Sequence, residues 1–158
     1  MSIHLIRHAH AGSRKGWPGD DQLRPLSRRG IAQAAIIDRD LADAGIDLLW
    51  SSRFVRCVQT LEPMAERLGL EIVATDDLSE GGSGAKALDA LLAAAEAGHV
   101  VAASSHGDVI PDIVHQALRR GAELHGSDSP GKGARYELTV VDGAVTHVRH
   151  VAAPDGRT

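Results

Sequence analysis

A mainly apolar run at residues 3–6, Ile3-His4-Leu5-Ile6, ends in the pair Arg7-His8 and is followed by a loop that contains Gly12. A short apolar run bounded in this way is typical of a buried strand. In an open α/β sheet, ligands bind outside the carboxyl ends of the strands. The pair therefore predicts a site that combines a fixed positive charge with an imidazole able to act as nucleophile, acid or ligand.

The rest of the chain alternates short apolar runs with segments of helical periodicity. Further strands are expected at 46–50, 71–74, 99–103, 136–141 and 145–150, and helices at 28–44, 53–68, 85–97 and 108–120. Pro63 predicts a break in the second helix, because proline lacks a backbone N–H. Asp142-Gly143 is a strong hairpin signal between the last two strands. The alternation predicts an α/β fold, namely a three-layer α/β/α sandwich whose central sheet is mostly parallel and ends in an antiparallel hairpin.

Length and composition set the broad class. The 158 residues fit one domain, expected at 1–151, followed by a flexible tail at 152–158. Hydrophobic residues make up 43% but aromatic residues only 3%, so the core must be aliphatic. The net charge of −4 argues against a partner that is a nucleic-acid polymer, and the apolar runs are too short to span a membrane. With Cys57 as its single cysteine, the chain is expected to be a cytoplasmic protein with no disulfide.

Three strand-to-helix turns carry the residues of chemical interest. They place Arg7-His8, then Arg53 and Arg56, and then His106 at what should be one edge of the sheet. A phosphoryl group in transfer spreads negative charge over its oxygens, which arginine and imidazole N–H groups can stabilise. A neutral histidine can attack phosphorus without first losing a proton, so His8 is the expected nucleophile. Glu80, in a polar loop after the third strand, is the candidate acid for the leaving group.

These residues carry a resemblance to a known family. Arg7-His8-Ala9 resembles the RHG/RHA motif of the histidine phosphatase superfamily, which has the phosphoglycerate-mutase-like fold. Residues 52–60 resemble its S-x-x-x-R-A-x-x-T motif, which places the second arginine at Arg56, and Ser105-His106-Gly107 resembles its SHG motif. Leu26-Ser27-x-x-Gly30 matches the L-[ST]-x-x-G element that opens the first helix of the family.

The resemblance implies a mechanism and a range of substrates. His8 would be transiently phosphorylated, while Arg7, Arg56 and His106 would bind the phosphate, with no cofactor and no metal. The short chain resembles the SixA branch of phosphohistidine phosphatases and the phosphatase module fused to some Nudix hydrolases. The expected partner is therefore a phosphorylated small molecule, a nucleotide included, or a phosphohistidine protein. Arg14 and Lys132 lie in loops where they could contact a charged substrate.

The sequence also departs from the family pattern. Ala9 replaces a glycine, and Cys57 replaces an alanine of similar volume. Leu78-Ser79-Glu80 resembles the L-x-E of members that use a glutamate as proton donor, whereas SixA-like members lack a clear equivalent.

Two alternative functions remain open. His8 and His10 form an H-x-H pair that could bind a catalytic metal, although the barrel fold that uses this pair typically has about 250 residues. A non-catalytic module that binds phosphate or a phosphoprotein would keep the pocket without turnover, but binding alone does not need the nucleophile.

Overall fold

A seven-stranded sheet forms the centre of the computed structural model, which describes residues 1–156. Its order is β3-β2-β4-β1-β6-β7-β5. The strands are β1 (Ser2–Arg7), β2 (Leu48–Ser51), β3 (Ile72–Ala74), β4 (Val101–Ser105), β5 (Glu123–His125), β6 (Arg135–Val141) and β7 (Ala144–Val151). The helices are α1 (Arg28–Asp40), α2 (Val55–Leu68), α3 (Gly84–Glu96) and α4 (Val109–Arg119), with single 3₁₀ turns η1 (Arg14–Gly16), η2 (Asp21–Leu23) and η3 (Asp76–Leu78).

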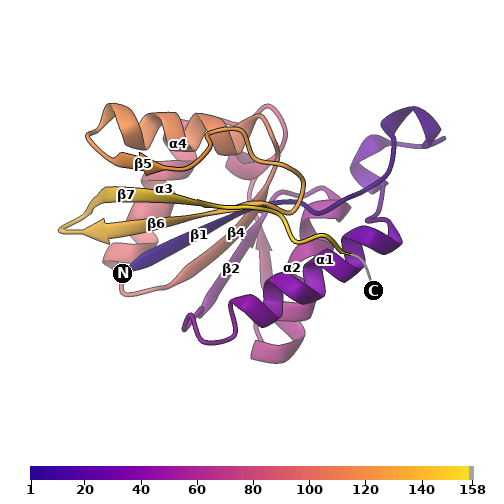
Figure 1. Ribbon diagram of the computed structural model, residues 1–158, viewed down its shortest axis with the longest axis horizontal. Coiled ribbons are helices and arrows are strands. Elements are labelled where there is room, and N and C mark those ends of the chain that lie inside the picture. The colour runs from indigo at the N-terminus through magenta and orange to yellow at the C-terminus, as the bar shows by residue number, and fades with distance from the viewer. Residues whose placement is uncertain (157–158) are drawn as a thin grey trace.

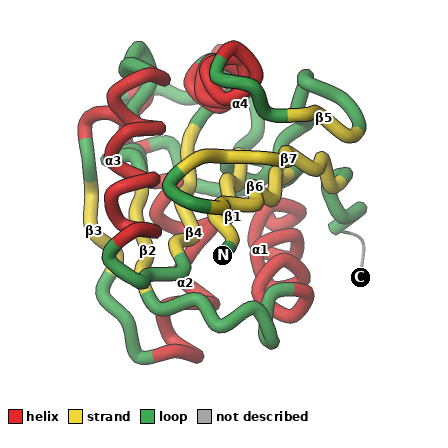
Figure 2. Tube along the Cα trace, turned by 90° about the vertical axis from the view of Figure 1, so that its left-hand side faces the viewer, coloured by secondary structure: helices red, strands yellow, loops and turns green. Residues whose placement is uncertain are grey.

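Helices cover both faces of the sheet. In Figure 1, α3 and α4 lie on one face and α1 and α2 on the other. Figure 2 shows β3 at one edge of the sheet and β5 at the other. The hydrophobic clusters on the two faces of the sheet are built mainly from Leu, Ile, Val and Ala, and Tyr136 is a fully buried aromatic residue in the largest cluster. The predicted three-layer α/β/α sandwich with an aliphatic core is confirmed.

Strand direction brings the predicted site together. β1 and β2 are both parallel to β4, and β3 is parallel to β2, whereas β6 runs antiparallel to β1 and β7. The predicted hairpin turn forms at Asp142 and Gly143, which both have positive φ, as a type I′ turn requires. Because β1, β2 and β4 point the same way, the residues that follow them emerge at one edge of the sheet.

The structure differs from the prediction at two elements. α2 continues through Pro63, so the predicted break is wrong. Proline removes a single backbone N–H, and the buried side chains Leu61 and Met64 hold the helix against the sheet on either side of it. The sequence predicts a loop at residues 121–133, but β5 forms within it. Three residues are too few to show a periodic pattern.

The segment after β7 runs along α1. Gln33 Nε2 donates to the carbonyl of Pro154 at 2.9 Å, and Arg29 Nε donates to that of Asp155 at 3.1 Å. The flexibility expected for 152–158 stays a prediction, and residues 157–158 of that tail lie outside the described residues. Among the described helices, none has both the length and the apolar character needed to cross a membrane.

Candidate active site

A cavity of about 580 Å³ opens at the carboxyl edge of β1, β2 and β4. The sheet and α2 bring Arg7, His8, Arg56 and His106 to its wall from three distant parts of the sequence. The other lining residues are Gly12, Ser13, Arg14, Arg24, Glu80, Gly107, Asp108 and Lys132. Every residue predicted for the site therefore lines one cavity.

The His8 ring is buried and held in one orientation. Its Nδ1 lies 2.8 Å from the carbonyl oxygen of Ala9, which can only accept, so the ring proton belongs on Nδ1. Nε2 then carries a lone pair, and Arg56 Nε donates to it at 3.4 Å. Burial, aided by the charges of Arg56, His106 and Arg7, lowers the pKa of His8 to about 3 against the opposing effect of the Ala9 hydrogen bond. His8 is thus a neutral imidazole near pH 7 with an unprotonated Nε2.

Arg7 is fixed by a backbone carbonyl and by the absence of a side chain at Gly107. Its Nη1 donates to the carbonyl of Pro130 at 2.8 Å. A Cβ at position 107 would come within 2.7 Å of the Arg7 Cζ, so only glycine lets the guanidinium lie there. Among the described residues, the buried Arg7 Nε has no hydrogen-bond partner. This buried donor is suited to an anionic oxygen in the pocket.

Arg56 is the largest fully buried side chain of the described residues. Its Nη1 donates to the carbonyl of Asp21 at 2.9 Å, and its Nη2 donates to Asp21 Oδ2 at 3.1 Å. The guanidinium carbon lies 4.8 Å from the centre of the Phe54 ring, a distance at which a cation is attracted to the ring face. The prediction that Arg56 rather than Arg53 belongs to the site agrees with this geometry, since Arg53 is exposed and pairs with Asp76.

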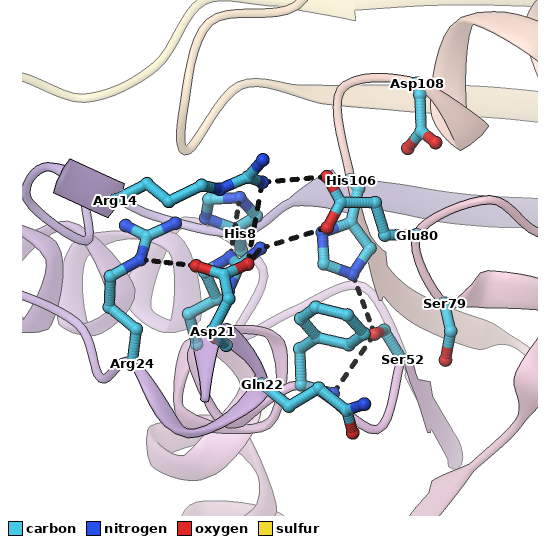
Figure 3. Close-up of polar contacts among 12 residues, drawn as sticks. His8, Arg14, Asp21, Gln22, Arg24, Ser52, Ser79, Glu80, His106 and Asp108 are labelled. Atoms are coloured by element: carbon cyan, nitrogen blue, oxygen red, sulfur yellow. Dashed lines mark hydrogen bonds and ion pairs between the residues drawn. The ribbon is translucent and has the colours of Figure 1, made fainter. Parts of the chain in front are cut away.

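The carboxylate of Asp21 lies where three guanidinium groups converge (Figure 3). Besides Arg56, it accepts from Arg24 Nε at 3.0 Å and lies 3.5 Å from Arg14 Nη2. Burial raises the pKa of Asp21, but the hydrogen bond from Arg24 and the charges of Arg56 and Arg14 outweigh it and leave the pKa lowered. Asp21 is therefore an anion that neutralises the arginines.

Glu80 reaches the same arginines from the other side of the pocket. Its Oε1 accepts from Arg14 Nη2 at 2.9 Å, and its Oε2 lies 3.6 Å from Arg56 Nη2. Glu80 thus lines the same cavity as His8 and Arg56. Asp108 also lines the cavity, but its carboxylate accepts from the backbone N–H groups of Val109 and Gly81.

His106 is oriented by Ser52. The Ser52 hydroxyl oxygen accepts from the backbone N–H of Phe54 at 3.2 Å and lies 2.8 Å from His106 Nε2. Its own proton can then be donated to Nε2, which leaves the ring proton of His106 on Nδ1 as a donor for a ligand. The Phe54 ring packs edge-on against the imidazole at 4.7 Å. Burial, with the charge of Arg56, lowers the pKa of His106 to about 4.

Lys132 comes to the cavity on the loop between β5 and β6. The backbone N–H of Gly133 donates to the carbonyls of Arg7 and His8, which ties this loop to the end of β1. Among the described residues, no carboxylate forms an ion pair with Lys132. Burial and the nearby Arg7, Arg24 and Arg56 lower the pKa of Lys132. The pocket thus contains a cation that no carboxylate of residues 1–156 pairs with.

His10 has a structural position. Its Nδ1 lies 2.7 Å from the hydroxyl of Ser27, and its carbonyl accepts from the N–H and the hydroxyl of that same residue. A Cβ at Gly30 would lie 2.0 Å from the His10 carbonyl oxygen, so glycine lets α1 approach this loop. The two histidines of the H-x-H pair are thus each held at Nδ1 by a different group, the Ala9 carbonyl for His8 and the Ser27 hydroxyl for His10.

The sequence does not predict roles in the site for Arg24, Ser52 and Phe54. For Asp21 it favours a cap or a solvated loop carboxylate over a proton donor, and it does not predict the pairing with Arg56. Asp21 and Arg24 lie three residues apart in a 3₁₀ turn, and such a spacing of opposite charges was a usable signal. Ser52 was recognised as part of a motif but was given no role. Nothing in the sequence marked Phe54, because a single aromatic residue has no pattern.

Comparison with known proteins gives consistent results. Residues 3–87 match the family model of the histidine phosphatase superfamily, branch 1. The chain is 30% identical over 158 residues to an 8-oxo-(d)GTP phosphatase of Mycolicibacterium smegmatis, and the match covers 98% of this chain but 49% of that protein. This chain thus spans about half the length of that curated relative.

Solved structures of phosphatases share the fold. The protein histidine phosphatase SixA complexed with tungstate has a TM-score of 0.78 at 21% identity, covering 99% of this chain and 97% of the other. A mycobacterial glucosyl-3-phosphoglycerate phosphatase complexed with VO₃ has a TM-score of 0.70 at 18% identity, covering 97% and 99%.

Proposed function

Because this chain belongs to the histidine phosphatase superfamily, we propose that it is a phosphatase that hydrolyses phosphate monoesters through a covalent phosphohistidine at His8. The observation that carries the proposal is the state of His8, a buried neutral imidazole whose unprotonated Nε2 faces the Arg56 guanidinium. A histidine arranged in this way is suited to attack phosphorus, and the adjacent cation is suited to the oxygens of the phosphate.

In the first step, Nε2 of His8 forms a bond to phosphorus while the bond to the leaving oxygen breaks. Three groups donate hydrogen bonds to the phosphoryl oxygens, namely Arg7 Nε, the Arg56 guanidinium and His106 Nδ1. These donors stabilise the negative charge that is spread over the three oxygens in the transition state. Glu80 gives its proton to the leaving oxygen. In the second step, the Glu80 carboxylate takes a proton from water as the water oxygen attacks phosphorus, and phosphate leaves with His8 neutral again.

The pocket favours a substrate with a second anionic group, such as a nucleoside di- or triphosphate. Arg7, Arg56 and His106 suffice for one phosphoryl group, whereas Lys132 lines the same cavity and has no carboxylate partner within the described part of the chain. The volume of about 580 Å³ lies in the range that small-molecule ligands occupy. The 8-oxo-(d)GTP phosphatase to which the chain is similar acts, by its name, on a nucleotide. Phosphohistidine on a partner protein is the second candidate, which the likeness to SixA supports.

A phosphatase assay tests the mechanism. Wild type, His8→Ala and His10→Ala would be compared on p-nitrophenyl phosphate, a phosphohistidine peptide and nucleoside mono-, di- and triphosphates. We expect His8→Ala to lose about 10⁴-fold or more in kcat, as enzymes do when the nucleophile is removed. His10→Ala serves as the matched histidine control and should keep most of the activity of its folded fraction.

Two further measurements separate the alternatives. Rapid quenching of wild type should trap an acid-labile, alkali-stable phosphoenzyme that His8→Ala does not form, and activity should survive a chelator. Full activity of His8→Ala would contradict the proposal, and loss of activity with a chelator would support the metal alternative. A wild type that binds phosphate yet turns over none of the substrates would support the non-catalytic module.

Lys132→Ala tests the substrate class. We expect it to raise KM for nucleoside polyphosphates about tenfold, the scale of one lost charge contact, and to change KM for p-nitrophenyl phosphate little. Lys15→Ala is the matched control, because Lys15 lies in the adjacent turn η1 and does not line the cavity. An equal effect of Lys132→Ala on both substrates would contradict a second anion site.

A further inference from the structure

Three potential metal ligands gather on the sheet edge formed by β5 and β7. Glu123 and His125 lie at the two ends of β5, and His147 lies on β7, which pairs with β5 in parallel. Figures 1 and 2 show β5 beside β7 at the margin of the sheet. All three side chains are exposed, and none of the three residues lines the cavity that holds His8.

The spacing of their donor atoms suits a tetrahedral ion. His125 Nε2 lies 3.0 Å from His147 Nδ1, and Glu123 Oε2 lies 3.7 Å from the same Nδ1. One ligand atom from each residue lies within 4.8 Å of both others. Zinc binds nitrogen and oxygen at about 2.0–2.2 Å, so two ligands at tetrahedral angles stand about 3.4 Å apart. The site needs only small side-chain rotations to reach this geometry.

The register of the strands explains why these residues meet. Glu123 is paired with His147 across the parallel ladder, and His125 is two residue pairs further along, opposite Arg149. Side chains at positions i and i+2 of a strand point to the same face, so Glu123 and His125 flank His147 on one side of the sheet. The backbone thus holds the three side chains on one face of the sheet before any ion binds.

We propose that Glu123, His125 and His147 bind one zinc-class divalent cation, with water in the fourth position. Two imidazoles and a carboxylate form a donor set that zinc commonly takes. The ion would replace the hydrogen bond between the His125 and His147 rings, in which one ring N–H donates to the other ring's nitrogen. Its position makes it a structural ion that ties the three-residue edge strand β5 to β7. β5 leads into the loop that carries Lys132, so the ion stabilises the start of that loop.

Zinc titration of the chelator-treated protein tests the proposal. Isothermal titration calorimetry near pH 7.5 should give one Zn²⁺ per chain, and saturating Zn²⁺ should raise the Tm, because the ion binds the folded state. His125→Ala and His147→Ala should each weaken binding at least about tenfold and abolish the rise in Tm. Glu123→Gln, which keeps one oxygen ligand but loses the charge, should weaken binding less.

Two controls separate this site from others. His115→Ala removes an exposed histidine that pairs with Asp128 at 3.1 Å and should leave zinc binding unchanged. His8→Ala should also keep it, which places the ion away from the active site whether or not the enzyme works as proposed. The inference is overturned by a wild type that binds no zinc, by affinity that persists in both His125→Ala and His147→Ala, or by affinity lost in His8→Ala.

Discussion

Arg56 Nε lies 3.4 Å from Nε2 of His8, so a buried guanidinium donates to the ring nitrogen that carries no proton. A positive charge at this distance disfavours protonation of the imidazole. The same guanidinium can contact the oxygens of a phosphoryl group that approaches His8. One residue thus keeps the proposed nucleophile neutral and stabilises the charge of the group it attacks.

The first prediction concerns stability at acid pH. His8 and His106 have pKa values lowered from 6.5 to about 3 and about 4. Below about pH 6.5 the unfolded chain takes up protons at these positions that the folded chain does not, so the free energy of unfolding should fall as pH drops from 6.5 towards 4. Urea denaturation at pH 7 and pH 5 measures this fall.

A matched variant assigns the effect to His8. His8→Asn removes one of the histidines whose pKa is lowered in the folded chain, so its loss of stability between pH 7 and pH 5 should be smaller than that of wild type. A fall of the same size in both proteins would show that His8 does not carry a lowered pKa.

The second prediction concerns the orientation of His106. Ser52→Ala removes the hydroxyl that bonds to His106 Nε2. We expect kcat/KM to fall about five- to tenfold, equivalent to one hydrogen bond of about 1 kcal/mol, with the Tm changing little. Ser51→Ala is the control, because the Ser51 hydroxyl is equally buried but donates to a backbone carbonyl. Equal losses in the two variants would show that Ser52 does not position the imidazole.

The third prediction concerns the anion that pairs with Arg56. Asp21→Asn removes the negative charge that competes with phosphate for Arg56, Arg14 and Arg24. The inhibition constant for tungstate or inorganic phosphate should fall about three- to tenfold, because one repulsive charge near the surface is lost. Asp20→Asn is the control, since Asp20 caps η2 and forms no ion pair with these arginines. A collapse of kcat in Asp21→Asn would instead make Asp21 the proton donor.

The parts that could be predicted are those with a regular pattern or a fixed motif. The alternation of strands and helices predicted the three layers of the fold. The positions of Arg7, Arg56 and His106 at strand-to-helix turns predicted that they would lie together at one edge of the sheet. Arg14 and Lys132, predicted from loop position alone, line the same cavity. The predicted helix break at Pro63 is wrong, because α2 continues through this residue. Packing of the side chains on both sides of the missing hydrogen bond holds the helix together.

The parts that could not be predicted depend on contacts between distant segments. From its neighbours in the sequence, Asp21 is predicted to be a carboxylate in a loop. It pairs with Arg56 only because η2 packs over the N-terminal part of α2. β5 is too short to be recognised in the sequence. The contact between His125 and His147 follows only from the register in which β5 pairs with β7. Such contacts are tertiary, and a single sequence carries no direct record of them.

The fourth prediction concerns the proton donor. Glu80→Gln cannot protonate a leaving group, so kcat/KM, which reports the steps through phosphoenzyme formation, should fall about 100-fold for an alkyl phosphate. For p-nitrophenyl phosphate, whose phenolate leaves without a proton, kcat/KM should fall far less. Arg14→Gln removes the ion-pair partner of Glu80 and should affect both substrates alike. Equal slowing of the two substrates by Glu80→Gln would remove Glu80 from the acid role.

The last prediction concerns Gly107, whose missing side chain makes room for Arg7. In Gly107→Ala, the new Cβ would meet the Arg7 Cζ at 2.7 Å, so the guanidinium must move away from its place beside the Pro130 carbonyl. A displacement of about 1 Å in a phosphate-binding group costs about 100-fold in kcat/KM. Because the obstructed atoms belong to a long side chain and not to the backbone, the variant should still fold, with a Tm close to that of wild type.

Gly131→Ala is the matched control for this test. Gly131 lies in the loop that carries Lys132, and a Cβ there would meet no atom within 4 Å. Its steady-state kinetics should resemble those of wild type. If Gly107→Ala also kept its kcat/KM, Arg7 would have to be a structural side chain instead of a phosphate ligand, because moving a ligand by this much cannot leave the rate unchanged.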